Sequence, residues 1–375
     1  MVSMKDSDLT ILLNAIQTAC KLISRSVRKA GIANLYGSAG SENATGDSQK
    51  KLDVLSNDMM VNALYNSNVC AVLVSEENED PIIVEEGLAG KYCVAFDPLD
   101  GSSNIDCNVS TGTIFSVWEK TTPGPATVAD ILRPGREMVC AGYCCYGSAT
   151  EMVITYGKGV QRFTLDPSLG EFILTADNIV LPAVCKPIYS VNDGNYLTWD
   201  EPMQKAVDNF KFSKPAYAAR YVGSMVSDVH RTLLYGGVYL YPADKAKGNG
   251  KLRILYEGFP MAMIMEMAGG SATTGKWPRG ETKVRIGHHS MNDNNDCCVT
   301  TEHDANTWMF ASYACPLSHT LTHLSVLSGI PIRVPSLSSS VVLQILDIVP
   351  KDIHDKCPVI IGCNRDVDLV MSFYK

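Results

Sequence analysis

The spacing of apolar residues along the chain predicts both helices and strands. A helical spacing, ended by Gly31, connects Leu9, Leu12, Leu13, Ile16, Ile23 and Val27. We expect an amphipathic helix of about twenty residues there. Residues 31–46 are rich in Gly, Ser, Ala and Asn and predict a mobile loop, after which a second helix begins within residues 50–58. Short apolar runs at residues 70–74 and 92–96 predict buried strands.

The pattern further along the chain predicts strands interleaved with shorter helices. Residues 111–117 and 139–160 are strand-like, and further strands are expected within residues 182–191 and 236–242. A helix is expected through Val226, Val229 and Leu233, and another at residues 261–268, where Pro260 begins it and the methionines pack in the core. A domain boundary is expected near residues 179–186.

Residues 250–257 predict a strand with two cations on one face, because Lys251 and Arg253 alternate with apolar residues. Two cations followed by an acid suit a phosphorylated substrate beside a metal ion. An edge strand that carries solvated charges is the alternative.

The composition, with 46% apolar and 19% charged residues, is typical of globular proteins, and the length of 375 residues predicts two domains. The net charge of −8 argues against a nucleic-acid partner. No stretch is long and apolar enough for a membrane span, and the first residues do not form a signal peptide. The 13 cysteines are scattered through apolar runs without paired zinc-site spacing, so we expect reduced thiols and a cytoplasmic location.

Acidic residues follow two of the predicted strands. Asp97 and Asp100 lie three residues apart on a Pro-containing turn, and Glu76 and Glu77 follow the strand at residues 70–74. Carboxylates at one sheet edge are the ligands that hard divalent cations prefer, and a cation relieves their mutual repulsion. Residues 101–103, Gly-Ser-Ser, can bring backbone N–H groups close to a phosphate. An ordinary turn and a solvated acidic pair are the alternatives to a metal and phosphate site.

Five motifs carry a resemblance to a known family. They are Lys-Lys-Leu-Asp-Val-Leu-Ser-Asn-Asp at 50–58, Val-Ser-Glu-Glu at 74–77, Phe-Asp-Pro-Leu-Asp-Gly-Ser-Ser-Asn-Ile-Asp-Cys at 96–107, Ala-Arg-Tyr-Val-Gly-Ser-Met at 219–225 and Gly-Lys-Leu-Arg-Ile-Leu-Tyr-Glu at 250–257. The chain resembles the fructose-1,6-bisphosphatases, especially the animal forms, from about residue 9 to 276 and again from about 343 to 374. The third motif alone indicates only the wider lithium-sensitive phosphatase superfamily.

The resemblance implies a role for each matching position. The implied ligands of catalytic metals are Glu76, Glu77, Asp97, Asp100, Glu257 and the carbonyl of Leu99. Asp47 and Asp53 match acids that position or activate the attacking water, with Glu77 assisting. The residues implied to bind the 1-phosphate or to lie near it are Gly101, Ser102, Ser103, Asn104 and Arg253. The residues implied to bind the second phosphate and the sugar are Asn192, Tyr221, Gly223, Met225, Tyr241 and Lys251. Arg220 matches the arginine that the family lends to a neighbouring subunit's site.

The same resemblance implies the fold, the cofactor and the assembly. The expected fold is α/β, a layered α-β-α-β-α sugar phosphatase fold with two stacked mixed-sheet domains. Residues 1–180 would form a metal-binding and regulatory domain, and residues 181–375 a sugar-phosphate domain. The implied cofactor is Mg²⁺, with Mn²⁺ or Zn²⁺ as alternatives, and the implied assembly is a homotetramer. The implied reaction is hydrolysis of the 1-phosphate of fructose 1,6-bisphosphate in gluconeogenesis.

Three other functions stay open at this point. Sedoheptulose-1,7-bisphosphatase shares the catalytic acids but differs in the sugar-contact segments. Inositol monophosphatase shares residues 97–102 but lacks the second-phosphate residues. A catalytically impaired regulatory or scaffold homologue is the third.

The residues that correspond to the family's AMP site, here called the regulatory edge, depart from the family pattern. Animal members begin with an additional helix that forms one wall of an AMP site, and we expect that helix to be missing here. Thr10, Lys91 and Tyr92 match AMP contacts, but Glu119 stands where an arginine normally meets the AMP phosphate. A carboxylate there repels an anion, so we expect weak or absent AMP inhibition.

A second departure is an insert of about sixty-five residues, 277–341, where the family has a near-direct connection. The insert contains five of the seven histidines and lacks sustained helical or strand periodicity. Three interpretations are open: a zinc module, although the spacing fits no known finger, a surface insertion or lid, and a translated intron, which we favour. Ser-Leu-Ser-Ser-Ser at 336–340 is what a pyrimidine-rich tract before a splice acceptor would encode.

Overall fold

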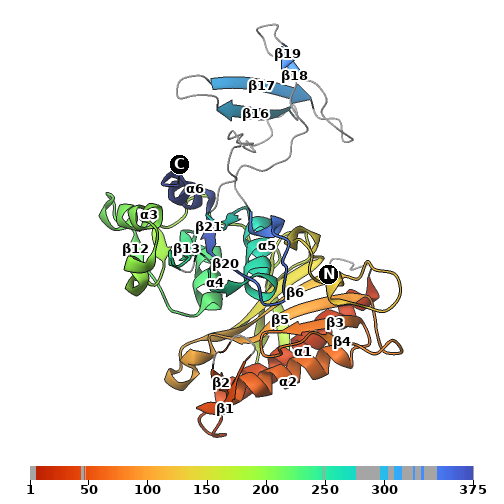
Figure 1. Ribbon diagram of the computed structural model, residues 1–375. Coiled ribbons are helices and arrows are strands. Elements are labelled where there is room, and N and C mark those ends of the chain that lie inside the picture. The colour runs from red at the N-terminus through yellow and green to blue at the C-terminus, as the bar shows by residue number, and fades with distance from the viewer. Residues whose placement is uncertain are drawn as a thin grey trace. The chain divides into compact units, whose positions relative to one another are not determined.

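A computed structural model describes residues 6–43, 46, 48–246, 248, 250–275, 296–302, 308–314, 324–325, 331–332 and 344–374 (Figure 1). The chain divides into two compact units, one of Met1–Gly275 with Gln344–Lys375 and the other of Lys276–Leu343. The second unit lies between Gly275 and Gln344 in the chain.

The first unit contains an eight-stranded sheet. Its order is β10 (Glu171–Ala176), β9 (Gln161–Asp166), β8 (Thr150–Thr155), β7 (Cys140–Tyr146), β6 (Thr111–Glu119), β5 (Tyr92–Asp100), β3 (Cys70–Ser75) and β4 (Ile82–Ile83). The pair β3–β5 is parallel, whereas the other pairs are antiparallel. The acidic residues that follow β3 and those at the end of β5 therefore lie at the same edge of the sheet.

Strand β5 is buried along its whole length because helices cover both faces of the sheet. On one face Val94 and Phe96 pack with α1 (Ser7–Lys29) and α2 (Lys51–Tyr65), which lie side by side in Figure 1. On the other face Cys93 and Ala95 pack with α4 (Met225–Tyr235) and α5 (Phe259–Met267). The alternation of the two side-chain sets along one strand gives two separate hydrophobic cores.

A second, five-stranded sheet lies beyond α4 and α5. Its order is β12 (Ala218–Ala219), β11 (Ile188–Ser190), β13 (Val238–Tyr241), β21 (Val359–Gly362) and β15 (Ser271–Thr273), with parallel and antiparallel pairs. Helix α5 contacts strands of both sheets, which is why its methionines are buried, as predicted. Helices α3 (Glu201–Phe212) and α6 (Asn364–Ser372) contact each other, and α6 also contacts β15 and β21. The mixed α/β architecture with stacked sheets confirms the predicted fold class.

Three local predictions were wrong. The loop predicted at 31–46 contains β1 (Ser38–Glu42), which pairs with β2 (Ser48–Lys50). The turn predicted at Asp97–Asp100 is part of β5, since an irregular register against β6 lets the strand continue past Pro98. The strand predicted at 250–257 is only β14 (Leu252–Arg253), which pairs with β20 (Lys356–Cys357) and is followed by a π-helical turn, η5 (Ile254–Gly258).

Short 3₁₀ turns connect the larger elements. They are η1 (Ser102–Cys107), η2 (Val128–Asp130), η3 (Gly135–Glu137), η4 (Asp193–Thr198) and η6 (Ile345–Asp347). Cysteines such as Cys93, Cys140 and Cys144 are buried as thiols, as predicted. Among the described helices, none combines the length and apolar character needed to cross a membrane.

The second unit contains two antiparallel pairs. Strand β16 (Asp296–Glu302) pairs with β17 (Trp308–Ala314), and β18 (Leu324–Ser325) pairs with β19 (Pro331–Ile332). The zinc hypothesis depends on the five histidines of the insert, which lie outside the described residues: His288, His289, His303, His319 and His323. In the first unit, Thr273 and Gln344 form an antiparallel bridge, so the chain leaves and re-enters that unit at adjacent positions.

Candidate active site

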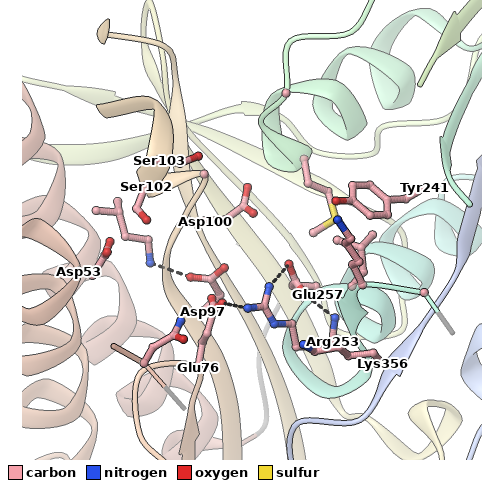
Figure 2. Close-up of a pocket in the computed structure, with 18 of the residues that line it drawn as sticks. Asp53, Glu76, Asp97, Asp100, Ser102, Ser103, Tyr241, Arg253, Glu257 and Lys356 are labelled. Atoms are coloured by element: carbon pink, nitrogen blue, oxygen red, sulfur yellow. Dashed lines mark hydrogen bonds and ion pairs between the residues drawn. The ribbon is translucent and has the colours of Figure 1, made fainter. Parts of the chain in front are cut away.

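A cavity of about 870 Å³ opens at the sheet edge where β3 and β5 end. Its lining includes sixteen of the predicted site residues: Asp53, Glu76, Glu77, Asp97, Leu99, Asp100, Gly101, Ser102, Ser103, Tyr221, Gly223, Met225, Tyr241, Lys251, Arg253 and Glu257. Figure 2 shows Asp53 and Ser102 on one side, Tyr241 on the other, and the acidic residues with Arg253 between them. The cavity thus brings together side chains from distant segments, since its lining runs from Asn43 to Lys356 in the sequence.

Three buried carboxylates converge on one point. An oxygen atom from each of Asp97, Asp100 and Glu257 lies within 4.8 Å of the others. Strand β5 supplies the two aspartates and η5 supplies the glutamate. The irregular end of β5 is held by bonds to its backbone: Thr113 Oγ1 donates to the Pro98 carbonyl at 2.8 Å, and the Leu99 N–H donates to Asp97 Oδ1 at 2.9 Å.

One guanidinium partly offsets the negative charge. Arg253 lies 2.6 Å from Glu76 Oε1 and 3.8 Å from Glu257 Oε1, as the dashed lines in Figure 2 mark. Burial nevertheless raises the pKa of Glu257 to about 8 and that of Asp100 to about 7. Burial, together with the charges of Glu76 and Asp100, raises the pKa of Asp97 well above its ordinary value.

The raised pKa values indicate that the protein alone does not neutralise the negative charge of this cluster. Buried carboxylates repel one another and favour protonation unless positive charge is added beside them. The donors are all hard oxygen atoms, which suit Mg²⁺ or Mn²⁺ better than soft metals. The cluster therefore fits a divalent metal centre.

Two further carboxylates face the cavity beside the cluster. Asp53, in the first turn of α2, accepts the Lys50 N–H at 2.7 Å through Oδ2, while its buried Oδ1 has no hydrogen-bond partner among the described residues. Burial raises its pKa to about 6. Glu77 accepts Gln49 Nε2 at 2.6 Å, and burial raises its pKa to about 7. Both groups can exchange a proton near neutral pH.

The Gly-Ser-Ser segment forms the N-terminal turn of η1, with Gly101 as its N-cap. Gly101 has φ +77°, a left-handed conformation that costs glycine little, and an added Cβ would meet the Ser224 side chain at 3.5 Å. The backbone N–H groups at the start of η1 suit an anion. Next to this turn, the N–H of Val226 at the start of α4 donates to Asp100 Oδ2 at 3.2 Å.

Among the predicted catalytic, metal and substrate residues that the structure describes, three do not line this cavity. Asn104 donates to the Gly223 carbonyl at 3.0 Å, and Asn192 caps η4 by accepting the Gly194 N–H at 3.1 Å. Arg220 lines a smaller cavity of about 370 Å³ instead. Asp47 lies outside the described residues.

The residues predicted at the regulatory edge meet around one carboxylate. Asp6 caps α1 and also accepts Lys91 Nζ and, at 2.9 Å, the Tyr92 hydroxyl. Lys91 lies 3.6 Å from Glu119, and the Thr10 hydroxyl donates to the Asp6 carbonyl at 3.2 Å.

Two lysines of the cavity lining were missed. Lys50 immediately precedes α2, and its position beside Lys51 and Asp53 in the first motif was a usable signal. Lys356 reaches the cavity because β20 pairs with β14, which places it opposite Arg253. No local pattern signals such a pairing across about a hundred residues. The cavity lining also includes Asn43, Ser48, Tyr239, Asp244, Gly250 and Leu252.

Comparisons with known proteins agree with this arrangement. The family model "Fructose-1-6-bisphosphatase, N-terminal domain" matches residues 2–177, and the model of the C-terminal domain matches residues 182–305. A cytosolic fructose-1,6-bisphosphatase of Arabidopsis thaliana is 59% identical over 272 residues, which are 72% of this chain and 80% of that protein. The cytosolic enzyme of Spinacia oleracea is 56% identical over 273 residues, with the same coverage. The crystal structure of Leishmania major fructose-1,6-bisphosphatase in holo form superposes with a TM-score of 0.78 at 40% identity, over 99% of this chain and 96% of that one.

Proposed function

This chain belongs to the fructose-1,6-bisphosphatase family, and we propose that it hydrolyses the 1-phosphate of fructose 1,6-bisphosphate to give fructose 6-phosphate and phosphate. The observation that carries the proposal is the buried acidic cluster beside the Gly-Ser-Ser turn, with Tyr221, Tyr241 and Lys251 lining the same cavity. One end of this cavity suits a metal and a phosphate, and the other end suits a sugar that bears a second phosphate. Because the relatives are named cytosolic, we propose the same location and a role in gluconeogenesis.

The metal centre of the proposal is formed by Asp97, Asp100 and Glu257, with Glu76, Glu77 and the Leu99 carbonyl as neighbouring ligands. We propose Mg²⁺ as the ion, with Mn²⁺ or Zn²⁺ as alternatives. A bound divalent cation neutralises charge on the phosphoryl oxygens during transfer and favours ionisation of the attacking water.

The protein's own groups position the reactants and move the proton. The N–H groups at the start of η1 hold the 1-phosphate, with Ser102 and Ser103 beside it. A water oxygen forms a bond to phosphorus while the bond from phosphorus to the C1 oxygen breaks. Asp53 and Glu77, with pKa values near 6 and 7, are suited to accept the water's proton, and the C1 oxygen takes up a proton from solvent. Asp47 is proposed to assist as in the family pattern.

Domain roles and assembly are part of the same proposal. Residues 1–180 would form the metal-binding and regulatory domain and residues 181–375 the sugar-phosphate domain, a division supported by family models that meet between residues 177 and 182. We propose a homotetramer in which the exposed side chain of Arg220 reaches the neighbouring site, with Asn192 on the sugar side. Light scattering on the purified protein measures the assembly, and a monomer would contradict it.

One phosphate-release assay tests the function. The purified protein is given fructose 1,6-bisphosphate, sedoheptulose 1,7-bisphosphate or an inositol monophosphate, with Mg²⁺ or with a chelator. We expect the highest kcat/KM on fructose 1,6-bisphosphate and loss of that activity in the chelator. Faster hydrolysis of either other substrate would transfer the assignment to that class, and no turnover of any substrate would indicate a scaffold or regulatory protein.

A further inference from the structure

A buried carboxylate outside the metal cluster holds the loop that carries Tyr221. Asp228 lies in the first turn of α4, and its side chain is fully buried. Its Oδ1 accepts the Ser190 hydroxyl at 2.9 Å and the Val222 N–H at 3.1 Å, and its Oδ2 accepts the N–H groups of Val222 at 3.0 Å and Gly223 at 3.1 Å. A single carboxylate thus fixes two successive backbone amides of the loop.

Arg231, one turn further along α4, completes this arrangement. Its Nη2 lies 2.8 Å from Asp228 Oδ1 and also donates to the Arg220 carbonyl at 2.8 Å. The Arg231 guanidinium therefore holds the first carbonyl of the loop at 220–223, and the Asp228 carboxylate holds the N–H groups of its last two residues. The arginine also balances the buried negative charge, as a buried carboxylate requires.

The loop needs this support because it has little packing of its own. The side chains of Tyr221 and Val222 are 39% and 44% exposed. Gly223 has φ +84°, and its carbonyl accepts Asn104 from the turn that holds the 1-phosphate. The position of Tyr221 and Gly223 in the cavity lining consequently depends on backbone hydrogen bonds to α4 rather than on apolar burial.

We propose that Asp228, aided by Arg231, is a positioning residue that sets the affinity for the sugar and its second phosphate. It does so through the loop at 220–223 and does not touch the substrate. The inference rests on the proposed function, because it assigns Tyr221 to the sugar-phosphate end of the cavity. Asp228 is not a member of the metal cluster, whose carboxylates come from β5 and η5, although the Val226 N–H in the same turn of α4 donates to Asp100.

The test compares Asp228→Asn with a matched control, Asp130→Asn. Asp130 is an equally buried carboxylate that accepts the N–H groups of Thr121, Thr122 and Thr127, in a segment that does not line the cavity. In Asp228→Asn, the side-chain NH₂ group replaces an oxygen that accepts backbone N–H groups. Because this NH₂ group cannot accept them, the loop loses a charged acceptor. We expect KM for fructose 1,6-bisphosphate to rise about tenfold or more, with a smaller change in kcat.

Inhibition by the two products separates positioning from general damage. The inhibition constant of fructose 6-phosphate, which occupies the sugar end, should rise together with KM, whereas that of inorganic phosphate should stay within about twofold. Asp130→Asn should lower the thermal midpoint and leave all three constants unchanged. Equal weakening of both products in Asp228→Asn, or no change in KM, would overturn the inference.

Arg231 provides a second variant that tests the same loop. If Asp228→Asn does not unfold cooperatively, Arg231→Gln decides, because it keeps the Asp228 carboxylate and its bonds to the loop amides while it removes the bond to the Arg220 carbonyl and the ion pair with Asp228. It should raise KM by a smaller factor, about three, and an unchanged KM there would overturn the inference. A wild-type protein that is inert toward fructose 1,6-bisphosphate would refute the proposed function, whereas an active wild type with an unaffected Asp228→Asn refutes only the role of Asp228.

Discussion

Replacing Asp53 by asparagine should stabilise the metal-free protein while it reduces activity. The Asp53 side chain is 2% exposed, and burial raises its pKa from 3.8 to about 6. The folded state therefore binds the proton more tightly than the unfolded chain does. Between these two pKa values the unfolded state ionises first, so the free energy of unfolding falls as pH rises through this window.

The expected magnitude follows from the size of that change in pKa. Ionising Asp53 in the folded protein costs about 3 kcal/mol relative to the unfolded chain once the pH is above both values. Asparagine carries no charge and can still accept the Lys50 N–H that Asp53 now accepts. We expect the stability advantage of Asp53→Asn to be smaller at pH 5 and to approach about 3 kcal/mol at pH 8.

Denaturant unfolding at pH 5 and pH 8, in a chelator, measures this difference. Asp58→Asn, on the exposed side of the same helix, is the matched control and should show little change between the two pH values. Phosphate release by Asp53→Asn should fall about a hundredfold or more if this carboxylate accepts the water's proton. An advantage that is equal at both pH values would refute the argument from buried charge, and undiminished activity would refute the catalytic role.

Three other predictions concern the cluster, the regulatory edge and the second unit. Asp100→Asn should abolish turnover and leave the thermal midpoint near that of wild type or above it, because it removes a buried charge; more than a few per cent of wild-type Mg²⁺-dependent phosphate release would contradict this role. AMP should inhibit the wild type weakly, because the Asp6 carboxylate already holds Lys91, and Asp6→Asn should strengthen the inhibition. Strong inhibition of the wild type at micromolar AMP would contradict this prediction. Deleting the second unit should leave a folded, active protein, because Thr273 and Gln344 already form a bridge and a short connection can join them; an insoluble or inactive product would contradict it.

The transcript offers a separate check on the second unit. If the insert is a translated intron, a messenger RNA will join the codons of Lys276 directly to those near Leu343. Amplification across this junction distinguishes that product from one that retains the intervening codons. Recovery of the longer product alone would favour a genuine insertion.

Much of the fold and of the site could be predicted because the information is local. The apolar run before Asp97 is continuous, and such a run predicts a strand that is covered on both faces. The carboxylates of the cluster lie directly at strand ends or in short motifs, so a few consecutive residues suffice to suggest a metal and a phosphate. Helix α1 was predicted nearly to its ends, since the apolar spacing from Leu9 to Val27 covers most of the observed helix of 23 residues.

The remaining features depend on which distant segments the tertiary structure brings together. The sequence alone determined elements such as α1, β3 and β5 and the chemistry of the acidic motifs, because these depend on neighbouring residues. Only the tertiary structure placed Lys356 opposite Arg253 and gave Asp228 two loop amides to hold. Such contacts are set by strand pairing and helix packing between distant segments, for which no single segment has a periodicity or a composition of its own.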